Sequence, residues 1–258
     1  MVVKFNLDLS KSDRTELMSE QYYAKLGSLL KDEQHNCFEK VLSEYVNGGV
    51  LDASLIESDW FPEYKAHVFI SHSHKDIDLV SRLAGFLLDK YKIVSFVDST
   101  VWGYADDLLD LIDNEYNTLE TESGKILYDR DLVRRSAAHI YLLLQGAILK
   151  MINKCDCLIF VNTPNSIKLS DIENDNRTAS PWIYNELLIA NTIPVRKRRN
   201  IVAQYASPPQ IEYKVNLEEF CVLKLSDFEN AQKVAKSKKP EKLLDQLYVQ
   251  KGIWGTAL

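Results

Sequence analysis

Two kinds of hydrophobic pattern alternate along the chain from residue 64 onward. Short apolar runs rich in Val, Ile and Phe have the composition of buried strands, and they occupy residues 67–70, 93–97, 157–163, 200–203 and 220–225. Apolar residues at i, i+3 and i+4 predict helices at 78–90, 108–112, 133–152, from 180 onward and at 241–250. Alternating strands and helices of this kind predict an α/β fold with a parallel sheet flanked by helices.

Residues 1–60 have a different character. They are polar, and apolar residues at helical spacing occur over 17–30 and 36–45, with Gly48 and Gly49 interrupting the second run. No chemical motif occurs in this part of the chain. The pattern predicts a helical N-terminal extension over 1–60, followed by a main domain over 64–250.

Composition and charge narrow the class of protein. An apolar fraction of 46% with 26% charged residues is that of an ordinary globular protein. The net charge is 31 − 37 = −6, which favours neither nucleic acid nor an anionic membrane as a partner. The four cysteines form no CxxC pair, no signal peptide opens the chain, and no apolar run approaches the ~20 residues of a membrane span. These features predict a reduced, cytoplasmic setting.

The segment 180–186 reads as a helix start that delivers a carboxylate to a ligand site. Ser180 suits the N-cap and Pro181 the first helical position. Trp182 and Glu186 stand at i and i+4, so an aromatic ring and an acid share one helix face. The segment follows a predicted buried strand, and loops after parallel strands surround the ligand crevice of such sheets. The alternatives are a solvent-facing glutamate and a core tryptophan.

A second segment, 69–76, ends a predicted strand in small polar residues and opens a helix. Ser71, His72 and Ser73 would present hydroxyls, an imidazole and backbone N–H groups to the crevice. The alternative is that Ser73 or Asp76 caps the following helix, and for Asp76 capping is the interpretation we favour.

Three motifs together resemble those of Toll/interleukin receptor (TIR) domains. They are Val68-Phe-Ile-Ser-His-Ser…Asp76, then Val97-Asp98 followed by Val101-Trp102-Gly103, then Ser180-x-Trp182-x-x-x-Glu186. They occur in the family's order, and the resemblance covers roughly residues 64–225. It implies a flavodoxin-like TIR fold whose second motif ends a strand and enters a loop. The chain departs from a minimal TIR domain by an insertion at about 104–134.

The resemblance also implies an activity. Some TIR domains cleave the bond between nicotinamide and ribose in NAD+, and by this likeness Glu186 is the catalytic residue. Ser71, His72, Ser73, Asp98, Trp102 and Trp182 are then the expected substrate-binding residues, with Asp98 and Trp102 lining the loop. NAD+ would be a substrate, so no cofactor is expected.

The family offers a biological context and two competing functions. Stand-alone bacterial TIR proteins act in antiphage defence, either depleting NAD+ or producing a nucleotide that a separate effector senses. This likeness predicts ADP-ribose or a cyclic ADP-ribose isomer as product, and self-association through the TIR domain. The alternatives are a non-enzymatic TIR interaction module and a related nucleoside or nucleotide N-glycosidase.

The sequence contains no convincing motif for metal binding or for redox chemistry. The run His72-Ser-His74-Lys-Asp76 resembles the opening motif of metallo-β-lactamase-like hydrolases, but Ile77 stands where another His is usual. Only His139 follows, so the chain lacks the imidazoles that a dinuclear site needs, and we expect no metal. No G-x-G-x-x-G, P-loop or G-x-S-x-G motif occurs.

Overall fold

A five-stranded parallel sheet forms the centre of the computed structural model. The structure describes residues 2–34, 42–47, 50–97, 99–119, 126–169, 176–193, 213–214, 220–235 and 239–253. The strands are β1 (Val3–Asp8), β4 (Val68–Ser71), β5 (Ser95–Val97), β8 (Cys157–Asn162) and β12 (Cys221–Leu223). Their order is β12-β1-β8-β4-β5, and every neighbouring pair is parallel. The predicted α/β class with a parallel sheet is confirmed.

Strand β1 corrects the expectation of a purely helical segment over residues 1–60. Val3–Asp8 pairs with β8 on one side and with β12 on the other, so it is an inner strand of the sheet. The sequence carries the signal, since Val3, Phe5 and Leu7 alternate with Lys4, Asn6 and Asp8. The helical period farther along hid this short alternation. Helix α2 (Gln21–Gln34) covers most of the predicted run 17–30, whereas helix α1 (Lys11–Ser19) begins before that run and ends within it.

The order of the strands is compatible with a flavodoxin-like sheet. In the flavodoxin order 2-1-3-4-5, the first strand of the unit lies between the second and the third. Strands β5, β4 and β8 reproduce that arrangement, with β4 as the first strand. The next position is filled by β1 from the N-terminus, and β12 forms the edge. The strand predicted at 200–203 lies outside the described residues.

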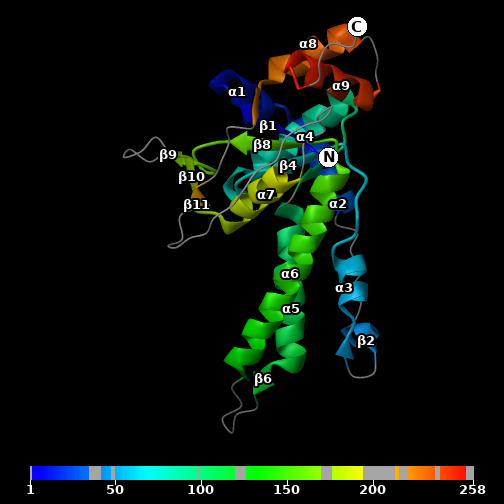
Figure 1. The fold of residues 1–258 in the computed structure, drawn as a ribbon, viewed down its shortest axis with the longest axis vertical. Helices are drawn as coiled ribbons and strands as arrows, with labels where there is room; N and C mark the ends of the chain where they lie inside the picture. The colour runs from blue at the N-terminus through cyan, green and yellow to red at the C-terminus, as the bar shows by residue number, and fades with distance from the viewer. Residues whose placement is uncertain are drawn as a thin grey trace.

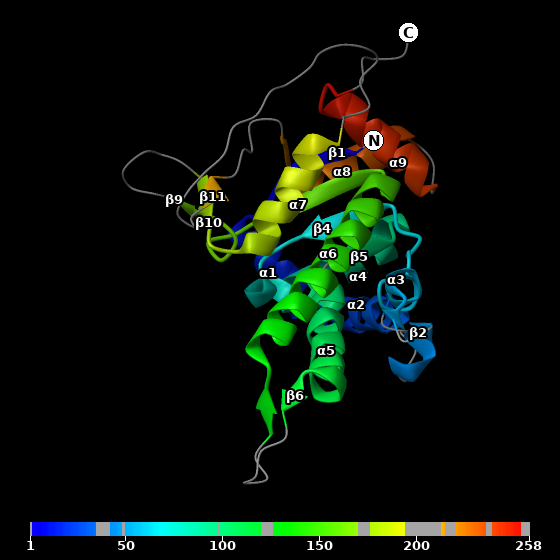
Figure 2. The ribbon, with the colours of Figure 1, turned by 60° about the horizontal axis from the view of Figure 1, so that its bottom comes forward.

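Helices cover both faces of the sheet. One face packs against α3 (Ala53–Trp60), α5 (Ser99–Tyr116), α6 (Arg130–Lys154) and α7 (Pro181–Thr192), and we call it the α7 face. The opposite face packs against α1, α2, α4 (Ile77–Tyr91), α8 (Leu225–Ala235) and α9 (Pro240–Gln250). Figure 2 shows α7 and α6 lying across the strands.

The face opposite α7 is apolar across the inner strands, and we call it the apolar face. Successive side chains of a strand point to opposite faces. The residues on this face are Val3, Phe5, Leu7, Val68, Ile70, Cys157, Ile159 and Val161. These residues form the core between the sheet and the helices α1, α2, α4, α8 and α9.

The segment predicted as an insertion forms most of a helical hairpin. Helices α5 and α6 run antiparallel, and between them lie the short strands β6 (Thr118–Leu119) and β7 (Leu127–Tyr128). Figure 1 shows the two helices descending side by side from the sheet, with β6 at their far end. Leu108 and Ile112 of α5 and Ile140 and Leu144 of α6 are buried in one core cluster. Both helices are longer than the predicted segments 108–112 and 133–152.

Helices α2 and α4 approach each other closely through glycines. A Cβ atom at Gly27 would overlap the carbonyl oxygen of Ser81, and one at Gly85 would overlap that of Tyr23. Only glycine allows backbones to meet at this distance. The N-terminal segment is therefore joined to the layer below the sheet by this contact, in addition to strand β1.

Short elements complete the described chain. They are η1 (Leu42–Tyr45), β2 (Val46–Asn47), β3 (Val50–Leu51), η2 (His74–Asp76), β9 (Lys168–Leu169), β10 (Asn176–Thr178) and β11 (Tyr213–Lys214). Strands β9, β10 and β11 form a small antiparallel sheet, in which β9 and β10 precede α7 in the sequence and β11 follows it.

Candidate functional site

Helix α7 begins as its sequence predicts. The Ser180 hydroxyl accepts a hydrogen bond from the Ile183 N–H at 3.3 Å, and Pro181 occupies the first turn. The backbone N–H of Ser180 donates to Thr178 Oγ1 at 3.2 Å, which fixes the residue that precedes the helix. The N-cap prediction for Ser180 is confirmed, and Trp182 and Glu186 lie on consecutive turns of one helix.

Contacts along α7 establish its direction over the sheet. At its C-terminal end, Lys4 Nζ of β1 donates to Asn191 Oδ1 at 3.1 Å. At its N-terminal end, the Trp182 ring packs on Tyr141 of α6 with ring centroids 5.4 Å apart. Because Lys4 lies near the amino end of β1, α7 runs antiparallel to the strands. Its first turn therefore lies toward the carboxyl edge of the sheet, where ligands of open α/β sheets bind.

Glu186 is fully buried, with 0% of its surface exposed. It shares the buried side of α7 with Ile183, Leu187 and Ala190, which belong to the core of the α7 face. Glutamate is almost never fully buried unless it is paired, because an ionised carboxylate is costly to remove from water. The solvent-facing alternative for Glu186 is therefore wrong.

Trp182 is partly buried and packs against the same core. Its partner Tyr141 donates a hydrogen bond to Asp106 Oδ1 at 3.3 Å, and burial followed by the Asp106 charge raises the pKa of the phenol. Gln145 of α6 donates to Asn185 Oδ1 at 2.9 Å one turn farther along. These contacts fit the core-aromatic alternative for Trp182 and fix α7 against α6.

Ser71, His72 and Ser73 lie together where β4 ends. Ser71 is the last residue of the strand and is fully buried, and His72 is 3% exposed. His72 Nδ1 lies 3.4 Å from the Ile70 carbonyl oxygen. Ser73 is half-buried and precedes η2 without a capping hydrogen bond from its side chain, so the capping alternative for Ser73 is not supported.

The strand register brings Ser71 into line with a polar residue of β1. Ser71 pairs with Phe160 of β8, and Phe160 pairs with Asn6 of β1 on its other side. All three side chains are on the α7 face by the alternation of their strands. Two strand spacings separate Asn6 from Ser71, which corresponds to about 10 Å.

Glu186 lies at the level of this row. It precedes Asn191 by about 7.5 Å along the helix axis, at 1.5 Å per residue. Asn6 follows Lys4 by about 6.6 Å along the strand. The hydrogen bond between Lys4 and Asn191 is a common reference point for the two distances. Measured from it toward the carboxyl edge of the sheet, Glu186 and Asn6 are displaced by about the same amount. The α7 face thus combines a buried carboxylate, a hydroxyl and an amide in its carboxyl half.

Asp76 connects two loops at the carboxyl edge. Its Oδ2 accepts a hydrogen bond from Thr163 Oγ1 at 2.5 Å, and its Oδ1 accepts one from Asn165 Nδ2 at 2.7 Å. It makes no side-chain capping bond to α4, so the helix-cap interpretation of Asp76 is wrong. The carboxylate instead ties the loop after β8 to the loop after β4, which fixes one border of the site.

The prediction that Asp98 and Trp102 line a loop can be compared with the structure only at Trp102. Asp98 lies outside the described residues. Trp102 lies within α5, so the expectation that residues 101–103 form a loop is wrong. The reason is that the helical period of 108–112 extends back to Ser99, directly after β5.

The described cysteines and possible metal ligands do not form a further candidate site. Burial raises the pKa of Cys155 to about 12, and it raises the pKa of Cys157 well above its usual value. Both thiols therefore stay neutral near pH 7 and make poor nucleophiles. Over the described ranges, no three His, Cys, Asp or Glu side chains are grouped to hold a metal ion. Among the described helices, none combines the length and apolarity needed to cross a membrane.

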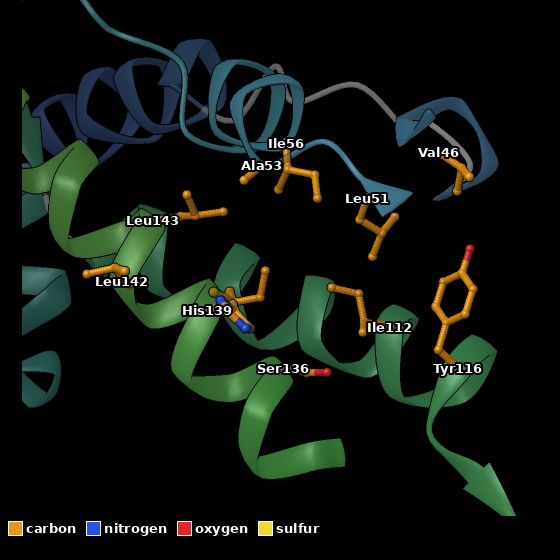
Figure 3. Close-up of a pocket in the computed structure, with 11 residues that line it drawn as sticks. Val46, Leu51, Ala53, Ile56, Ile112, Tyr116, Ser136, His139, Leu142 and Leu143 are labelled. Atoms are coloured by element: carbon orange, nitrogen blue, oxygen red, sulfur yellow. The ribbon is translucent and has the colours of Figure 1, made fainter. Parts of the chain in front are cut away.

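A separate cavity of about 760 Å³ lies away from Glu186, beside the helical hairpin. Figure 3 shows α5 and α6 on one side of it and the segment containing Val46, Leu51 and Ile56 on the other. Its lining is mostly aliphatic, with Ser136, His139 and Tyr116 as the polar members. None of the predicted site residues is among the described residues that line it.

Sequence reasoning missed the contribution of β1 to the site. Asn6 lies in the row with Ser71, and Asp8 pairs with Asn162 one step closer to the carboxyl edge. The alternation in residues 3–8 was the available signal, but only the pairing with β8 shows that Asn6 shares a cross-strand row with Ser71. Comparison of the chain with protein-family models, curated proteins and solved structures finds no match, so the arrangement of these side chains is what bears on function.

Proposed function

We propose that the protein cleaves the N-glycosidic bond between nicotinamide and ribose in NAD+. The observation that carries the proposal is the buried carboxylate of Glu186, held by a capped helix over the carboxyl half of a parallel sheet. Ligand sites of open α/β sheets occupy this edge. The resemblance of Ser180, Trp182 and Glu186 to the catalytic motif of TIR NADases adds independent support.

One carboxylate is sufficient for this reaction. The nicotinamide nitrogen already carries a positive charge, so the bond to C1′ breaks with its electron pair leaving on nicotinamide, without a general acid. The sugar then approaches an oxocarbenium ion, which a nearby carboxylate stabilises electrostatically. We assign that role to Glu186. Water attack at C1′ gives ADP-ribose and releases a proton, whereas attack by an adenine nitrogen gives a cyclic isomer.

The other residues of the site bind and orient the substrate in this proposal. Ser71, His72 and Ser73 hold ribose or phosphate oxygens at the end of β4, and Trp182 forms part of the wall above them. NAD+ is consumed as a substrate in this reaction. A cyclic product would act as a signal for a separate effector, in keeping with the resemblance to antiphage TIR proteins.

The burial of Glu186 sets a condition on the activity. A side chain with 0% exposure cannot be touched by a dinucleotide, so substrate binding requires a rearrangement that uncovers it. The contacts at Trp182, Asn185 and Asn191 hold α7 in the covered arrangement. Self-association is one trigger that would supply such a rearrangement, and activity should then rise with protein concentration.

A second candidate function is an interaction module without catalysis. It is favoured by the same burial of Glu186 and by the hairpin, which exposes large apolar side chains. These include Leu111, Tyr116, Leu119, Ile126, Leu127 and Leu142. Such exposure is typical of surfaces that bind other proteins.

Nicotinamide release from NAD+ tests the proposal. The purified protein is assayed over a range of protein concentrations, with products separated by chromatography, beside Glu186→Gln. Loss of an electrostatic stabiliser of this kind costs about 10²–10³-fold in kcat, so we expect near-complete loss at unchanged thermal stability. Glu115→Gln, an exposed glutamate on the hairpin, is the matched control and should retain the parent rate.

The outcomes separate the two functions. Release by the parent with loss in Glu186→Gln supports the NAD+ reaction and identifies the product. Equal release by both proteins removes Glu186 from catalysis. Absence of release at every concentration favours the interaction module.

A further inference from the structure

Two buried polar atoms on the α7 face have no hydrogen-bond partner among the residues that the structure describes. They are Oδ1 of Asn6 and Oγ of Ser71. The two residues flank Phe160 in one cross-strand row, at the level of Glu186. Asn6 belongs to none of the sequence motifs, and it lies in β1, the strand found within the segment that was expected to be helical.

An orphaned polar group in a buried strand is costly to keep. Leaving a buried acceptor unpaired costs about 1–3 kcal/mol, whereas an apolar residue of the same shape would avoid that cost. The preceding residue of β1, Phe5, shows that this strand accommodates large apolar side chains on its other face. The amide of Asn6 is therefore better explained by a partner that the site binds than by packing.

The chemistry of the two atoms indicates what that partner carries. An amide oxygen only accepts hydrogen bonds, so it needs an O–H or N–H donor. A serine hydroxyl both donates and accepts. Sugar hydroxyl groups both donate and accept, so they meet either requirement, and the carboxylate of Glu186 lies on the helix above.

We infer that strand β1 forms one wall of the substrate site and that Asn6 accepts a hydrogen bond from a ribose hydroxyl. This inference rests on the proposed NAD+ reaction and specifies which residue selects its sugar. Asn6 and Ser71 engage the substrate once α7 has moved to uncover Glu186. Asn6 is thus a specificity-determining residue supplied by the N-terminus of the chain.

Asn6→Leu tests the inference, because it keeps the shape of the side chain and removes its polar atoms. A residue that is merely structural would change stability and leave substrate binding alone. We expect the thermal midpoint to stay the same or rise, while the KM for NAD+ rises about tenfold, the equivalent of one lost hydrogen bond. The value of kcat should change little, since the contact is made equally before and during bond cleavage. Ser71→Ala should behave in the same way.

Asn117→Leu is the matched control. Asn117 is a buried asparagine whose Nδ2 donates to Asp113 Oδ1 at 2.6 Å and to Ser136 Oγ at 2.9 Å. It lies in the helical hairpin, away from the site. Its replacement should lower the thermal midpoint and leave the KM for NAD+ unchanged.

The readouts distinguish failure of this inference from failure of the proposed reaction. If the parent releases nicotinamide and Asn6→Leu keeps the parent KM, the role of Asn6 is refuted while the reaction stands. If the parent releases none, the same variants are compared by the rise in thermal midpoint that ADP-ribose causes. A rise in the parent that Asn6→Leu and Ser71→Ala lose supports the inference. No rise in the parent, or an equal rise in the variants, overturns it.

Discussion

The two faces of the central sheet are made by the same strands and bury very different side chains. The apolar face presents only hydrophobic residues from β1, β4 and β8 to the layer below. The α7 face carries Asn6 and Ser71 in its carboxyl half, beneath a helix with a buried glutamate. Burying apolar surface stabilises the fold, whereas burying polar groups opposes it unless each is satisfied. The first face therefore explains why the chain folds, and the second is where we propose that it acts.

Lys4 shows how the α7 face accommodates a polar residue at its amino end. Its side chain is 2% exposed, yet its ammonium donates to Asn191 and lies 5.9 Å from the centre of the Phe220 ring. The stem of a lysine packs as apolar surface while the charge finds specific partners. This polar group joins β1 to α7, so its role in the structure is clear. The same cannot be said of Asn6, two residues farther along the strand.

Phe5→Ala should give the largest effect and would break the apolar face. Phe5 is fully buried and its ring stacks on Tyr248 with centroids 6.1 Å apart. Truncating a buried Phe removes transferred surface and leaves a cavity, which costs about 3–5 kcal/mol. Urea denaturation would measure the loss in unfolding free energy. The adjacent Asn6→Leu should cost nothing, and equal losses at the two positions would contradict the division between the faces.

Much of this arrangement could be predicted from the sequence, because the spacing of hydrophobic residues within a segment indicates whether it forms a strand or a helix. The buried runs at 67–70 and 157–163, the Ser180 N-cap and the parallel class all follow from neighbouring residues. Helix α8 was not predicted, and Leu225, the last residue of the predicted run 220–225, belongs to it. The predicted ends of short strands and helices can differ from the observed ends by one or two residues, because hydrophobic periodicity does not define an element's exact boundary.

The relation between β1 and the site could not be predicted in the same way. Its alternation indicates a strand, but only the register against β8 puts Asn6 in the same cross-strand row as Ser71. Pairing between segments about 150 residues apart depends on the whole sheet. Likewise, no motif specifies that Glu186 is fully buried. Motifs therefore located the helix, and tertiary packing determined what its carboxylate faces.

Tyr91→Phe tests whether the helices on the apolar face lose stability at high pH, when a buried tyrosine ionises. Burial, reinforced by Glu229 and Tyr23, raises the pKa of Tyr91 to about 12 from 10.0. The unfolded phenol ionises first, so the stability that depends on neutral Tyr91 is full below pH 10 and falls as pH rises toward 12. At pH 11 the loss is about 1.4 kcal/mol.

The measurement for Tyr91 is the unfolding free energy of parent and variant between pH 8 and pH 11. Parent and Tyr91→Phe should differ by a constant amount at the lower pH values, and the parent should lose more stability above pH 10. Tyr22→Phe, at an exposed tyrosine, controls for the loss of a phenol hydroxyl. Parallel curves for the parent and Tyr91→Phe would show that this phenol is not held neutral by the fold.

The smallest effect concerns how α7 is held over the polar half of the sheet. A double-mutant cycle between Trp182→Ala and Tyr141→Ala isolates their ring contact, which should contribute about 0.5–1.5 kcal/mol to stability. If α7 must move to uncover Glu186, Tyr141→Ala should also increase nicotinamide release, because it loosens the helix and leaves Trp182 available to the substrate. A coupling near zero would place Trp182 outside the packing of α7. Reduced release by Tyr141→Ala at unchanged stability would mean that the covered position of α7 is itself the one that acts.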